Sequence, residues 1–66
     1  MFTQAQATAF RAKIIKEVPH IDVQINAEES PYPSEYYLVI SSAGKIRFVV
    51  RDEAQWQERK HLVMDR

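Results

Sequence analysis

Residues Glu35 to Arg51 read EYYLVISSAGKIRFVVR, two apolar runs on either side of a short polar stretch. The alternation in both runs is typical of β-strands, so only the register between them is open. Pairing Ile40 with Arg47 would put a cation on the apolar face. A shift of one residue pairs Ile40 with Ile46 and makes one face continuously apolar. The same register then places Leu38 opposite Phe48 and Tyr36 opposite Val50.

The turn of this hairpin is expected to be a three-residue loop, Ser42 to Gly44. Loops of this length usually combine a type I turn with a left-handed residue, a conformation that glycine adopts without steric cost. Gly44 is the only glycine in the chain and stands at that position. The turn therefore agrees with the register, which also brings Glu35 opposite Arg51 as a charge pair.

The composition predicts one small domain over residues 1–66. A hydrophobic content of 45% is normal for a globular fold, and nine basic residues balance nine acidic ones, so no strong field attracts nucleic acid or an anionic membrane. The absence of cysteine excludes disulfides and thiolate zinc sites. No apolar run approaches the ~20 residues of a membrane span, and no signal peptide is recognisable. We expect a cytoplasmic protein without a membrane partner.

The N-terminal half is predicted to hold a helix and a strand. The helix covers about residues 3–17, because Thr3 and Gln6 form a capping box and Pro19 ends the three- and four-residue apolar spacing. The strand covers about 20–26, where apolar and polar residues alternate strictly.

A loop and a last helix complete the expected elements. Residues 27–34, AEESPYPS, have the composition of a surface loop. Asp52 is placed to cap a helix over about 53–62. The apolar stripe of that helix is thin, so it either continues or ends near Lys60 and leaves 61–64 as a further turn or an extended tail.

The fold class that follows is α+β, with the order α-β-β-β-α. Three strands, at about 20–26, 35–41 and 45–51, form an antiparallel meander, with both helices on one face and the other face open. The expected core consists of Phe10, Ile14, Ile21, Val23, Ile25, Leu38, Ile40, Ile46, Phe48, Val50 and Trp56.

This order of elements resembles that of the double-stranded-RNA-binding fold. In that fold the RNA contacts depend on a lysine cluster at the start of the last helix. Here the corresponding residues are Asp52, Glu53, Ala54 and Gln55. The resemblance is therefore one of topology and does not extend to the RNA contacts.

Catalytic chemistry finds little support in the sequence. The chain has two histidines, no cysteine and a single glycine, which disfavours nucleophilic triads and phosphate-binding loops. His20 and Asp22 share a predicted sheet face, but a metal site would need a third ligand such as His61, Glu28 or Glu29. We expect no enzyme, no metal and no cofactor. A small hydrolase or a metal-dependent enzyme is the remote third possibility.

The open face of the sheet is the candidate binding site. Its predicted centre is apolar and its rim is charged or polar, which is the anatomy of a modest protein interface. Tyrosine and arginine are also frequent anchors of binding energy. We expect a protein partner or a homodimer, with no catalytic role. The predicted contact residues are Tyr37, Val39, Arg47, Val49, Arg51 and Gln24.

Two alternatives apply to the same face. It could be an ordinary solvated surface, with β-branched residues serving strand propensity. It could also bind nucleic acid, because cations beside an aromatic ring are typical of sheet-based readers. Glu35 and Asp22 on that face and the zero net charge weigh against this reading. The residues of the nucleic-acid alternative are Arg47, Arg51, Lys45 and Tyr37.

Overall fold

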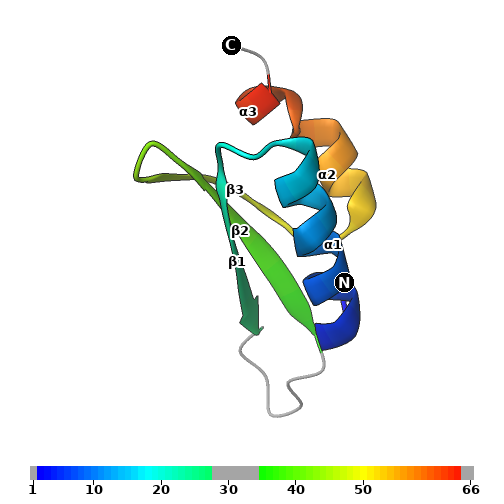
Figure 1. The fold of residues 1–66 in the computed structure, drawn as a ribbon. Coiled ribbons are helices and arrows are strands. Elements are labelled where there is room, and N and C mark those ends of the chain that lie inside the picture. The colour runs from blue at the N-terminus through cyan, green and yellow to red at the C-terminus, as the bar shows by residue number, and fades with distance from the viewer. Residues whose placement is uncertain (1, 28–34, 65–66) are drawn as a thin grey trace.

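Three antiparallel strands, in the spatial order β1-β2-β3, form a meander with α1 and α2 on one face (Figure 1). The computed structural model describes residues 2–27 and 35–64. This arrangement confirms the predicted fold class. The elements are α1 Gln4–Glu17, β1 Asp22–Ala27, β2 Tyr36–Ser42, β3 Lys45–Val50, α2 Glu53–Arg59 and α3 His61–Met64.

Most element boundaries lie close to the predicted ones, and the last helix differs most. It ends at Arg59, and His61–Met64 form a separate helical turn after Lys60. Most of the predicted loop, with Glu28 and Glu29, lies outside the described residues. None of the helices in residues 2–27 and 35–64 is long and apolar enough to cross a membrane.

The predicted capping box starts α1. The Thr3 hydroxyl accepts a hydrogen bond from the Gln6 backbone N–H at 3.1 Å, and the Gln6 side chain accepts one from the Thr3 N–H at 3.0 Å. These two bonds satisfy backbone donors that the first helical turn leaves unpaired. The helix ends at Glu17, two residues before Pro19. Its buried face, which consists of Ala7, Phe10 and Ile14, covers the sheet.

The predicted hairpin register is wrong along its whole length, because Ile40 does not pair with Ile46, nor Leu38 with Phe48, nor Tyr36 with Val50. The loop has two residues, Ala43 and Gly44, with φ values of 55° and 77°, and it joins Ser42 directly to its partner Lys45. Two consecutive positive φ values are the signature of a type I′ turn, whose twist matches that of the flanking strands.

A β-bulge then shifts the register by one further residue along the strands. Ser41 pairs with Ile46, but Ile40 pairs with Phe48, so Arg47 is an extra residue in β3. Beyond the bulge Leu38 pairs with Val50, and both side chains are fully buried. The core face of β3 is therefore preserved although the turn is one residue shorter than predicted.

The shorter turn changes the sides on which two residues lie. Ile46 was expected in the core, but it faces away from the helices with Ser41 and is 70% exposed. Lys45 pairs with Ser42, which places it on the side of Ile40 and not on the open face.

The core lies between the sheet and the helices. The other predicted core residues are buried, apart from Ile25 and Phe48, which are half-buried and packed against the core. Phe2 also joins it, because its backbone pairs with Tyr36 at the level where β3 has already ended. The other residues of the core that were not predicted are Ala7, Val18 and Val63.

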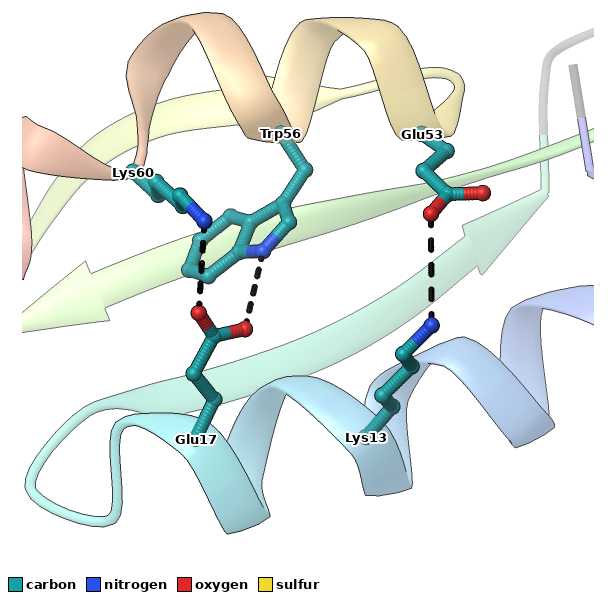
Figure 2. A network of polar contacts seen from close by, with 5 residues as sticks. All are labelled: Lys13, Glu17, Glu53, Trp56 and Lys60. Carbon is teal, nitrogen blue, oxygen red and sulfur yellow. Dashed lines mark hydrogen bonds and ion pairs between the residues drawn. The ribbon is translucent and has the colours of Figure 1, made fainter.

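Trp56 holds α2 against α1. Its side chain is 1% exposed, and its ring centroid lies 6.3 Å from that of Phe48. The indole Nε1 donates to Glu17 Oε1 at 3.4 Å, and Lys60 Nζ lies 3.4 Å from Glu17 Oε2 (Figure 2). These contacts join α2 and the following Lys60 to α1, so they hold α2 over the same face of the sheet as α1. The other sheet face stays open.

Candidate functional site

The face of the sheet opposite α1 and α2, called the outer face below, carries three rows of cross-strand neighbours. The first row is Asp22, Ser41 and Ile46, and the second is Gln24, Val39 and Val49. The third row begins with Asn26 and Tyr37, and the register beyond Val50 brings Arg51 next to them. Arg47 stands at the bulge beside the first row.

The predicted centre of the outer face is more covered than the sequence indicates. Val39 lies in the middle of the central strand and is only 6% exposed, although it is not part of the core cluster. Val49 beside it is half-buried, and Gln24 on the other side is exposed. The Val39 side chain is therefore mostly covered and offers little surface to a partner.

Tyr37 and Arg51 form a stacked pair. The Arg51 guanidinium carbon lies 5.1 Å from the centroid of the Tyr37 ring. This cation–π geometry covers one face of the ring with a cation. The predicted register placed Glu35 opposite Arg51, but the shorter turn and the bulge together bring Tyr37 to that place. The stack leaves Tyr37 less free to receive a nucleic-acid base.

Ile46 is the most exposed large apolar side chain on the outer face, at 70%. Sequence reasoning missed it because the expected register turned it inward. The sequence signal for it is weak, because Gly44 suits a two-residue turn but Ala43 has to adopt a positive φ that alanine rarely takes. Exposed Arg47 follows it directly, so the bulge presents an apolar and a cationic side chain together.

A shallow cavity of about 450 Å³ lies beside the start of β1. It spans the side of the sheet between the outer face and α1, and Asp22 contributes an exposed carboxylate. The lining therefore combines apolar, amide and acidic groups. Its residues are Arg11, Ile15, Ile21, Asp22, Val23, Gln24, Ser41, Gly44 and Ile46.

Both edges of the sheet carry an arginine from a helix. Arg11 Nε donates to the Val23 carbonyl of β1 at 2.7 Å, and Arg59 Nη1 donates to the Val49 carbonyl of β3 at 2.9 Å. Edge strands present unpaired backbone groups that recruit other strands, and proteins commonly protect them. The two arginines disfavour strand addition at these edges. The broad surface that remains open on the sheet is the outer face.

The Arg11 contact gives a testable prediction. Replacing Arg11 with methionine should lower the free energy of unfolding by about 1 kcal/mol and promote aggregation, because the Val23 carbonyl loses its donor. Lys16→Met is the matched control, since Lys16 is an exposed cation on the same helix. Light scattering and urea unfolding measure the two effects. Equal aggregation of the two variants would show that Arg11 does not protect the edge.

The described part of the chain holds no cluster of metal-ligating side chains. No three His, Cys, Asp or Glu side chains there come close enough together to hold a metal ion. His20 precedes β1, and its Nε2 lies 3.1 Å from the Val63 carbonyl, to which the ring N–H donates. The predicted pairing of His20 and Asp22 on one strand face is therefore not formed.

Comparisons with models of known protein families, with curated proteins and with solved structures each gave no match for this chain. Its function therefore has to be inferred from the residues of the outer face.

Proposed function

We propose that this domain is a non-catalytic binding module whose outer face contacts another protein. The observation that carries the proposal is the two-residue turn with its bulge, which together place Ile46 on the face that holds Tyr37 and Val49. Around this apolar strip stand polar and cationic side chains, including Gln24 and Arg51. An apolar centre with a polar rim and Tyr–Arg anchors is the pattern of protein interfaces.

Three features of the sheet favour protein over nucleic acid as the ligand of the outer face. Lys45 lies on the opposite side of the sheet, Arg51 stacks on Tyr37, and Asp22 places a carboxylate in the first row. Nucleic-acid affinity depends on neutralising phosphates with several cations. A chain with zero net charge and a mixed-charge face supplies few of them.

The size of the face sets the strength of the contact. Three strands about 4.8 Å apart and about 20 Å long make a surface of roughly 300 Å². Stable interfaces bury about 800 Å² per partner, so the outer face alone supports a transient interaction. The proposal keeps a cytoplasmic location, which the cysteine-free composition favours.

Site-specific photocrosslinking in living cells tests the proposal. A benzophenone amino acid at Gln24 should form crosslinks to protein, because this exposed position lies in the middle row of the outer face. The same group at Gln57, which is exposed on α2, is the matched control and should form few crosslinks. Mass spectrometry identifies the products.

Two results would contradict the proposal. Equal crosslinking from the two positions, or none from either, would show that the outer face is not a preferred contact surface. A crosslinked product that nuclease digests would identify nucleic acid as the ligand.

A further inference from the structure

We infer that the partner on the outer face is a second copy of this chain. The two copies are related by a two-fold axis parallel to the strands, so that Ile46 and Arg47 of each copy meet the cavity beside β1 of the other. The inference rests on the proposed function, because it names the occupant of the same face.

The order of the strands makes this arrangement self-complementary. When two outer faces meet about an axis that runs along β2, β1 of one copy lies over β3 of the other. Asp22, Ser41 and Ile46 form one row across the sheet. An axis that passes near Ser41 therefore brings each Ile46 over the Asp22 end of the opposite row, where the cavity lies.

The apolar parts of the two surfaces match. Ile46 is 70% exposed in the isolated chain, which leaves most of its side chain in water. The cavity of about 450 Å³ is lined in part by half-buried Ile15 and by the copy's own Ile46, and Ile21 and Val23 are buried beneath it. Burying Ile46 there would remove apolar surface from water in both copies at once, which is a favourable change.

The charges of the two surfaces match as well. Asp22 is an exposed carboxylate in the cavity lining, and Arg47 is an exposed cation directly after Ile46. The two-fold arrangement therefore places two Arg47–Asp22 pairs across the interface. The cation already in the lining, Arg11, is held by the Val23 carbonyl. The net charge of zero adds no overall repulsion between copies.

Charge-reversed variants test this geometry. Asp22→Arg and Arg47→Asp should each weaken self-association about tenfold or more, since like charges then face each other twice. An equimolar mixture of the two variants should regain wild-type association, because every facing pair is again of opposite charge. Sedimentation over a roughly hundredfold concentration range, up to about 1 mM, measures each sample.

Two further variants control for the apolar contact. Ile46→Glu should abolish association, whereas Leu62→Glu should leave it unchanged, because Leu62 is 50% exposed but belongs to α3. Circular dichroism checks that each variant is folded. If one charge variant does not fold, Ile46→Glu compared with Leu62→Glu still decides the contact.

Several outcomes would overturn the inference. A wild-type chain that stays monomeric at every concentration would exclude the dimer, and a mixture that associates no better than either variant would exclude this geometry. Equal effects of Ile46→Glu and Leu62→Glu would exclude the apolar contact. A chain that stays monomeric but whose crosslinker at Gln24 captures a different protein would overturn the dimer and leave the proposed function standing.

Discussion

Replacing Trp56 with alanine is expected to unfold most of the domain. Removing a buried tryptophan costs about 3–5 kcal/mol. A chain of this length has a total stability of roughly 3 to 10 kcal/mol, so this loss removes a large part of the free energy of unfolding. Trp56 is 1% exposed, packs on Phe48 and donates to Glu17. The variant therefore loses core volume and the link between α2 and α1, which circular dichroism and thermal unfolding will detect.

Gln57→Ala provides the control for this variant, because Gln57 is the exposed neighbour of Trp56 on α2. It should change the free energy of unfolding by no more than about 0.5 kcal/mol. If Trp56→Ala melted close to the wild-type temperature, the tryptophan could not be the main link between α2 and the rest of the core.

Ile40→Ala and Ile46→Ala should differ widely in stability although the predicted register paired them. Ile40 is fully buried, and its truncation should cost about 2–5 kcal/mol. Ile46 is 70% exposed on the outer face, and its truncation should change stability by no more than about 0.5 kcal/mol. Urea unfolding of the two variants at a dilution that keeps the chain monomeric measures the difference.

This pair of variants tests the bulge directly. In the predicted hairpin, which has a three-residue loop and no bulge, both isoleucines would face the helices and both substitutions would be costly. A large loss of stability from Ile46→Ala would therefore contradict the two-residue turn and the register shift after Ser41.

The fold class could be predicted because local signals agreed with the global pattern. The capping box of Thr3 and Gln6, the stop at Pro19 and the alternation of β1 are each visible in the sequence and present in the structure. The hairpin register could not be fixed in the same way. A three-residue loop and a two-residue turn followed by a bulge both place Phe48 and Val50 on the core face. The two hairpins differ in the side of the sheet on which Lys45 and Ile46 lie, and in which residue of β2 each residue of β3 faces.

The candidate site was only partly predictable. The strand pattern placed Gln24, Val39 and Val49 on one face, and the register puts them in one row. The stack of Arg51 on Tyr37 depends on the bulge, so pattern alone could not reveal it. The bonds of Arg11 and Arg59 to strand carbonyls depend on how the helices lie over the sheet, which short-range sequence signals do not specify.

The most direct test of the central claim, that the outer face is the protein-binding surface, is the crosslinking comparison between Gln24 and Gln57. Both are exposed glutamines, one on the outer face and one on α2. We expect protein crosslinks from Gln24 that are largely missing from Gln57. Crosslinks that come equally from both positions, or mainly from Gln57, would contradict it.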